Sequence, residues 1–253
     1  MLRKPIERPV ALVTGAGRNI GRAIAMALAV DGFSIAVNVS TSAEEGRSVV
    51  AELQALGAPA LLCMADVTDH SAVHLMVDSI LSQWGRLDVL VNNAAVRHEA
   101  PFAGLALPDW QRTLSVVLDG AFLCSQAASP FICKSSRGAI VNIGGLTGHT
   151  GAKDRVHVVT AKAGLVGLTK ALAHDLADAA VTVNCVSPGM ISTNRKLNSA
   201  SAKPAHHAVH HPLLPRRGTA EEVAAMVSWL ASDHARFVTG QVLHVNGGAH
   251  LGS

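Results

Sequence analysis

The chain has 253 residues, of which 49% are hydrophobic and 15% charged, so it is expected to be folded and not disordered. The formal net charge of +3 is too small to indicate nucleic acid or a membrane surface as a partner, and the apolar runs are too short for a transmembrane span. The N-terminus lacks an apolar signal core, and the scattered cysteines form no CxxC pair. We therefore expect a cytoplasmic protein with reduced thiols, acting on a small molecule. The cysteines are Cys63, Cys124, Cys133 and Cys185.

Short apolar strands alternate with helical stretches along the whole chain. This alternation predicts an α/β fold, a doubly wound, seven-stranded parallel sheet with helices on both faces, formed as a single domain over residues 1–253. One helix is expected to begin with a capping box at Ser42 and Glu45 and to stop at Gly57. The expected strands are Val10–Thr14, Ser34–Val39, Ala60–Met64, Val89–Asn92, Ala139–Ile143, Thr182–Val186 and Gln241–Val245.

The first strand leads into a glycine-rich turn, Thr14–Gly21, which is followed by an expected helix over Arg22–Val30. Glycines let the backbone approach a diphosphate closely, and a helix N-terminus adds N–H groups and a favourable dipole. An ordinary tight turn is the alternative, but the flanking strand and helix favour a nucleotide cofactor.

The end of the second strand predicts which cofactor is bound. Enzymes that prefer NAD place a carboxylate there, whereas this chain has Ser40 and Thr41 after Val39. These hydroxyls and the guanidinium of Arg18 can meet a 2′-phosphate. We therefore expect NADP(H) to be preferred over NAD(H). A solvated surface charge is the alternative for Arg18.

With these features the chain resembles the short-chain dehydrogenase/reductase family over roughly residues 8–250. The turn is similar to that family's TGxxxGxG motif, with Asn19 where the middle glycine usually falls. The resemblance implies a Rossmann-type fold, nicotinamide-dependent oxidoreductase activity, and a homotetramer or homodimer formed through the helix that carries Lys162. The other matching segments are Ala65–Val67, Leu90–Ala95, Ile140–Ile143, Thr160–Leu165, Asn184–Gly189 and Thr239–Gly248.

The same resemblance implies the cofactor contacts. Asp66 could instead be a helix N-cap, since Asp is favoured there. The implied contacts are Gly15, Arg18 and Ile20 at the phosphates, Asp66 and Val67 at the adenine, Asn92 and Ala94 at the ribose, Lys162 at the nicotinamide ribose, and Pro188, Gly189, Ile191 and Thr193 around the carboxamide.

The chain departs from the family at the catalytic positions. The family uses a Ser, a Tyr and a Lys with a supporting Asn, and the Tyr donates the proton that accompanies hydride transfer. Lys162 is present, but Val158, Gly145 and Val117 stand at the Tyr, Ser and Asn positions, and the chain contains no tyrosine. Loss of a positioned acid typically costs about 10²–10⁴-fold in rate.

His157, next to the vacant Tyr position, is the candidate replacement acid beside Lys162, although a helix rotates it by about 100° from Val158. His149, Thr147 and Lys153 are weaker candidates.

The irregular segment 192–217 is predicted to be a substrate lid because long breaks inside compact domains are usually functional. Its run His206–His211 has helical spacing that suits metal binding, but no further ligand is identifiable, so no metal site is expected.

The sequence thus predicts an NADP(H)-dependent oxidoreductase with an atypical proton donor and a carbonyl, imine or alkene substrate. One alternative is an NADP(H)-binding protein without redox turnover, a pseudoenzyme or sensor. Another is a non-redox lyase or isomerase on the same scaffold, since a fold does not determine its function.

Overall fold

The computed structural model describes residues 8–193 and 211–252, and every structural statement below refers to these residues. A seven-stranded parallel sheet has the order β3-β2-β1-β4-β5-β6-β7. The order reverses between β1 and β4, and ligands of such sheets bind at the carboxyl ends of the strands beside this reversal. The strands are β1 Val10–Val13, β2 Ser34–Val39, β3 Ala60–Met64, β4 Val89–Asn92, β5 Ala139–Ile143, β6 Thr182–Pro188 and β7 Val242–Val245.

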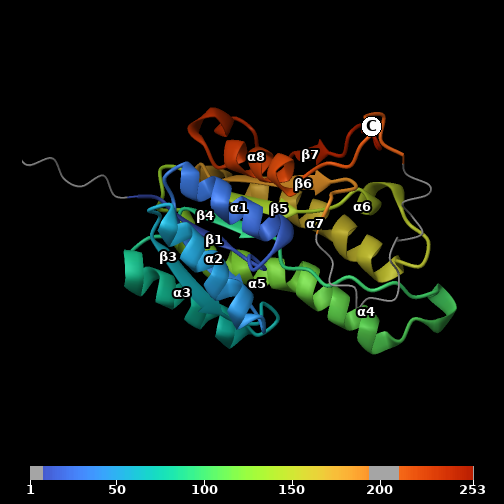
Figure 1. The fold of residues 1–253 in the computed structure, drawn as a ribbon, viewed down its shortest axis with the longest axis horizontal. Coiled ribbons are helices and arrows are strands. Elements are labelled where there is room, and N and C mark those ends of the chain that lie inside the picture. Colours follow the sequence, from blue (N-terminus) through green and yellow to red (C-terminus); the bar gives the residue numbers. More distant parts are fainter. Residues whose placement is uncertain (1–7, 194–210, 253) are drawn as a thin grey trace, which may run out of the picture.

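Helices cover both faces of the sheet, which confirms the predicted doubly wound architecture (Figure 1). Side chains alternate along β1, so Ala11 and Val13 join one core while Val10 and Leu12 join the other. The first core includes α1 Asn19–Val30, α2 Ala43–Ala55 and α8 Ala220–Leu230; the second includes α3 His70–Trp84, α5 Gly120–Ile132 and α7 Val156–Asp175. The remaining helical elements are η1 Phe102–Gly104, α4 Leu107–Leu114, the π-helix η2 Ser115–Asp119, α6 Thr147–Thr150, η3 Ala177–Ala179 and η5 Asp233–Ala235.

A buried carboxylate ties the amino ends of the central strands together, opposite the site. Asp88 accepts hydrogen bonds from the Val10 amide at 2.7 Å, from Arg86 at 2.6 and 2.9 Å, and from the Ser135 hydroxyl at 2.5 Å. Burial alone would raise the pKa of Asp88, but these donors lower it overall. Asp88 is therefore a structural anchor.

Two local expectations from the sequence are wrong. Ser42 is the N-cap of α2, but its side chain makes no capping hydrogen bond, and Glu45 lies beside Arg18. A capping box does form at the start of α8, between Thr219 and Glu222. In addition, α1 begins at Asn19 and not at Arg22.

Two helical stretches, Leu107–Ile132 and Val156–Asp175, meet the length and hydropathy of a membrane span, although the sequence predicted none. Core helices of globular proteins meet the same criterion, and both stretches pack on this sheet or on each other. The finding is therefore weak evidence for a membrane. The four cysteines are free, and three are buried while Cys133 is half-buried.

Candidate cofactor and active site

The glycine-rich turn is held against the end of β4. Asn93 donates through Nδ2 to the carbonyls of Thr14 at 2.8 Å and Gly15 at 3.0 Å. Gly15 has φ of 61°, and a Cβ there would lie 3.0 Å from the Ala94 Cα; a Cβ on Gly21 would lie 2.3 Å from the Gly15 carbonyl oxygen. Only glycine fits these two positions, so the turn is held close to the sheet.

The start of α1 suits a diphosphate. Asn19 has φ of 50°, in the left-handed region, which explains how asparagine stands where the family usually has glycine. The N-cap Arg18 places no side-chain hydrogen bond on the helix, and Ile20 is buried in the first turn. The N-terminal N–H groups are thus not capped by Arg18, as a phosphate-binding turn requires.

The corner expected to hold a 2′-phosphate also contains an acid. Ser40 and Thr41 are exposed after β2, and the glycine-rich turn that carries Arg18 meets the end of this strand, since a Cβ on Gly17 would lie 2.9 Å from Val39 Cγ1. However, Arg18 Nη1 lies 3.7 Å from Glu45 Oε1, and a Cβ on Gly17 would lie 3.4 Å from the Glu45 Cβ. The residues at the end of β2 include no acid, so none was predicted here. Glu45 enters this corner because α2 folds back over the glycine-rich turn.

The adenine side contains the predicted pair. Asp66 is exposed and its Oδ1 accepts from the amide and hydroxyl of Thr68 at 2.9 and 2.8 Å. The N-cap of α3 is Asp69, which accepts from the Ala72 amide at 3.0 Å, so Asp66 is not the helix cap. Val67 is buried beside a small cavity at the carboxyl ends of the strands.

Asn92, a predicted ribose contact, is hydrogen-bonded inside the sheet. Its Nδ2 donates to Asn142 at 2.9 Å and Ser125 at 3.1 Å inside the sheet, and Asn142 in turn donates to Thr169 at 2.9 Å. The side chain therefore braces β4 against β5 and α7 through Nδ2, while its Oδ1 has no hydrogen-bond partner among the described residues. Ala94 follows, half-buried at the cavity.

Lys162 on α7 is the one catalytic side chain of the family pattern that is present. Its ammonium is buried and donates to the Ile143 carbonyl at 2.5 Å. Burial, with a further contribution from the charge of Arg97, lowers the pKa of Lys162 to about 7. An amine with this pKa can both carry and release a proton near neutral pH.

The three other catalytic positions lack polar side chains. Val158 is buried one helical turn before Lys162, and Val117 on η2 packs against Ala161. Gly145 is different, because a Cβ there would meet only the Lys162 Cγ, at 4.0 Å. The serine position is thus open space, whereas the other two positions are filled with apolar groups.

His157 is fully buried, and its ring lies 5.9 Å from that of His98. Neither ring nitrogen has a hydrogen-bond partner among the described residues. Burial and the neighbouring His98 lower its pKa, which disfavours the charged acid form. Of the weaker candidates, Thr147 is buried and Lys153 is exposed.

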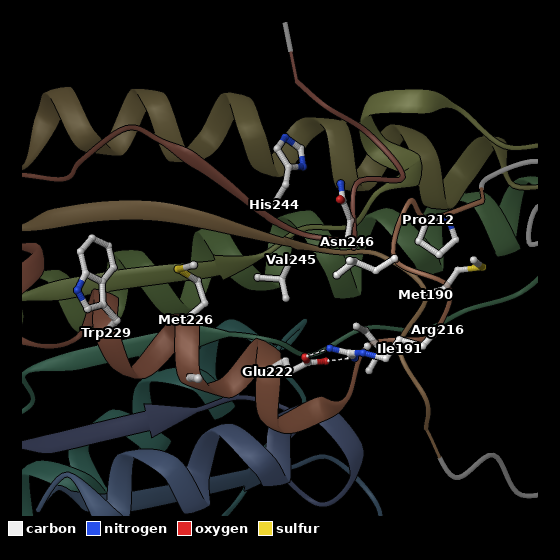
Figure 2. Close-up of a pocket in the computed structure, with 14 residues that line it drawn as sticks. Met190, Ile191, Pro212, Arg216, Glu222, Met226, Trp229, His244, Val245 and Asn246 are labelled. Carbon is white, nitrogen blue, oxygen red and sulfur yellow. Dashed lines mark hydrogen bonds and ion pairs between the residues drawn. The ribbon is translucent and has the colours of Figure 1, made fainter.

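The segment after β6 carries the predicted carboxamide contacts. Gly189 is close to the sheet, since a Cβ there would lie 2.7 Å from the Asn246 Cα. Ile191 bridges to Gly218 and lines a cavity of about 450 Å³ between α8 and β7 (Figure 2). Pro188 is buried at the strand end and Thr193 precedes residues 194–210, so most of the predicted lid 192–217 and of its histidine run lies outside the described residues.

The cavity between α8 and β7 is lined by residues other than the catalytic positions. Lys162, Val158 and Gly145 are absent from its lining, which instead includes Glu222 in a bidentate ion pair with Arg216 at 2.6 and 2.9 Å (Figure 2).

Three histidines from two distant segments of the chain also meet beside α6, the short helix that follows Gly145 and is called the active-site turn here. His149 on α6, His244 on β7 and His250 near the C-terminus have ring centroids 4.7 to 5.5 Å apart. The sequence did not reveal this group because no ligand-like spacing connects the three positions.

Comparison with known proteins agrees with this geometry. The sequence profile of the family described as enoyl-(acyl carrier protein) reductase matches residues 15–250. The 3-oxoacyl-[acyl-carrier-protein] reductase FabG of Staphylococcus aureus is 38% identical over 241 residues, which cover 95% of this chain and 98% of that protein. The 3-oxoacyl-[acyl-carrier-protein] reductase of Synechocystis is 40% identical over 240 residues, covering 94% and 96%.

Solved structures are also similar. A short-chain dehydrogenase from Burkholderia cenocepacia in complex with NADP has a TM-score of 0.88 and 34% identity, covering 97% of this chain and 99% of that one. A short-chain dehydrogenase/reductase from Serratia marcescens has a TM-score of 0.88 and 33% identity over the same shares. The fold and the relatives define a class of oxidoreductases that use nicotinamide cofactors. This chain belongs to the short-chain dehydrogenase/reductase family.

Proposed function

We propose that this protein is an NADP(H)-dependent oxidoreductase that reduces a small carbonyl, imine or activated alkene, with Lys162 as its proton donor. The observation that carries the proposal is the buried Lys162 ammonium, whose pKa is lowered to about 7 beside an otherwise apolar catalytic turn. The bound cofactor would supply the hydride. The substrate oxygen or nitrogen then needs one proton, and Lys162 Nζ can deliver it and be protonated again from water.

The cofactor would be held by the residues at the carboxyl ends of the strands. Gly15, Ile20 and the start of α1 would take the diphosphate, while Arg18, Ser40 and Thr41 would take the 2′-phosphate. The Glu45 carboxylate must then turn away from Arg18 or have its charge screened by the Arg18 guanidinium. The position of Glu45 in this structure therefore opposes NADP(H) binding. The remaining proposed contacts are Asp66, Val67, Ala94 and the Asn92 backbone at the adenosine and ribose, and Lys162, Pro188, Gly189, Ile191 and Thr193 at the nicotinamide half.

Lys162 is preferred over His157 as donor because Lys162 borders the open space at Gly145, whereas His157 is packed against His98 and favours its neutral form. His157→Gln removes the acid but keeps a polar side chain of similar size. With Lys162 as donor, this variant retains most of the reductase activity, whereas Lys162→Met loses it. Loss of reductase activity in His157→Gln but not in Lys162→Met would identify His157 as the proton donor instead.

The relatives named as 3-oxoacyl-[acyl-carrier-protein] reductases suggest the first substrates to test. A 3-oxoacyl thioester, a simple ketone, a cyclic imine and an enone cover the proposed substrate classes. NADPH oxidation with any of them, absent with NADPH alone, supports the proposal. Tight NADPH binding with no oxidation across the set would contradict it.

A second function is favoured by one specific observation, the apolar packing of Val117 and Val158. These side chains would make the protein an NADP(H)-binding sensor or the silent partner of an active relative. Product formed without cofactor oxidation would instead indicate a lyase or isomerase.

We expect the protein to be cytoplasmic and to assemble as a homotetramer or homodimer. In the most apolar 18-residue part of each of the stretches Leu107–Ile132 and Val156–Asp175, fewer than half of the residues are buried, and Phe122 and Leu107 are exposed. Such uncovered apolar surface is typical of an interface between copies of one chain. Sedimentation equilibrium gives the state directly, and a monomer at micromolar concentration would contradict it.

A further inference from the structure

Three imidazoles converge where α6, β7 and the C-terminal tail meet. One possible ligand atom from each of His149, His244 and His250 lies within 4.8 Å of the others. Three nitrogens bound to one zinc ion at 2.0–2.1 Å in tetrahedral geometry would lie roughly 3.3 Å apart. Small ring rotations would therefore bring the histidines around one ion.

One ring nitrogen of His149 and one of His244 lack hydrogen-bond partners among the described residues. His149 Nε2 and His244 Nδ1 are both buried, and neither has a hydrogen-bond partner among the described residues. A buried ring nitrogen without a partner carries a free-energy cost that a metal ion would remove.

Each histidine is held by its own element. A Cβ on Gly148 would lie 3.0 Å from the Lys162 carbonyl carbon, so α6 packs directly on the turn of α7 that carries Lys162. Asn246 Nδ2 donates to the His250 carbonyl at 3.0 Å and fixes the tail. Figure 2 shows the His244 ring pointing away from Glu222 and Arg216, to the opposite side of β7.

We propose that His149, His244 and His250 bind one transition-metal ion of the zinc type, which ties the C-terminal tail to the active-site turn. Three imidazoles without a carboxylate suit Zn²⁺, Ni²⁺ or Cu²⁺ and do not suit Mg²⁺ or Ca²⁺. The fourth position is open to water or to a ligand atom.

The test is Zn²⁺ binding to tag-free protein stripped with a chelator, measured by competition with a chromogenic chelator. One Zn²⁺ per chain is expected, and excess Mg²⁺ leaves it bound. His149→Gln, His244→Gln and His250→Gln should each weaken binding at least tenfold, since even the loss of a ligand's supporting partner costs about 10–100-fold. Co²⁺ in the same site should give the visible absorption of a tetrahedral complex.

The matched control removes His206, His207, His210 and His211 together by substitution with Gln. This variant keeps full Zn²⁺ affinity if the proposed site binds the ion. No binding by the parent protein, or loss in the control variant only, would overturn the proposal. His250→Gln lies in the tail and should leave the melting temperature of the metal-free protein unchanged, so lost binding there cannot be attributed to misfolding.

Discussion

Replacing Lys162 with methionine should remove one contribution that raises the free energy of unfolding as pH increases above neutrality. The folded-state pKa is about 7, against 10.5 for an ordinary lysine. Between these values the unfolded chain holds a proton that the folded chain has released, so the free energy of unfolding increases with pH. Below pH 7 the buried charge of Lys162 lowers the free energy of unfolding. This destabilisation falls to zero as the pH approaches 10.5, the pKa of an ordinary lysine.

The size follows from the width of the pH window. From about pH 7.5 to about pH 9.5, one fully released proton adds about 2–3 kcal/mol to the free energy of unfolding, at 1.36 kcal/mol per pH unit. The histidines whose pKa is lowered have an ordinary value of 6.5, so they have finished titrating before this window. Burial raises the pKa of Cys63, Cys124 and Cys185, so these thiols lower the free energy of unfolding as pH increases through the window. They do so in the wild type and in Lys162→Met alike, and the difference between the two slopes therefore isolates the lysine.

Urea unfolding of the cofactor-free protein at both pH values measures this difference. Lys162→Met leaves the Ile143 carbonyl without its donor, which lowers stability by about 1–3 kcal/mol at every pH. The slope against pH is therefore the readout, not the absolute value. Lys170→Met on the same helix is a matched control, because it is exposed and should keep the wild-type slope. Equal slopes in the wild type and Lys162→Met would refute a lowered lysine pKa.

Three further outcomes are expected. Arg18→Ala should raise the Kd for NADPH about tenfold or more and leave the Kd for NADH nearly unchanged, because a charge-assisted bond to the 2′-phosphate is lost. Glu45→Gln should lower the Kd for NADPH. Isothermal titration of both cofactors measures these changes, and an equal effect on NADPH and NADH would argue against a 2′-phosphate site at Arg18. The double variant Gly145→Ser/Val158→Tyr should raise ketone reduction by about 10²–10⁴-fold in a steady-state assay, with the tyrosine overpacking costing about 1–3 kcal/mol in urea unfolding. Asp88→Asn should lower the free energy of unfolding by roughly 3 kcal/mol or more, with the Ser135→Ala change alone costing less.

The fold could be predicted because buried parallel strands appear in a sequence as short apolar runs. Each of the seven expected strands is present, and deviations are confined to strand ends such as Pro188, the last residue of β6. The glycine-rich turn could also be predicted from the sequence, since Gly15 and Gly21 occupy positions where the Cβ of any other residue would collide with backbone atoms.

Contacts between distant segments could not be predicted in the same way. Glu45 reaches Arg18 only because α2 returns over the turn, and Asn92 points into the sheet because Asn142 and Ser125 meet it there. The burial that lowers the pKa of Lys162 is likewise a property of packing and not of motif spacing. The three-histidine group arises from the same cause.

The central claim is that hydride moves from NADPH to a substrate and that Lys162 supplies the accompanying proton. The most direct measurement uses NADPH deuterated at C4 and mass spectrometry of the reduced product. The account predicts one deuterium per product molecule with the wild-type protein, a rate that falls as pH increases through about 7, and loss of transfer in Lys162→Met. Bound NADPH with no deuterium in any product of the substrate set would contradict it.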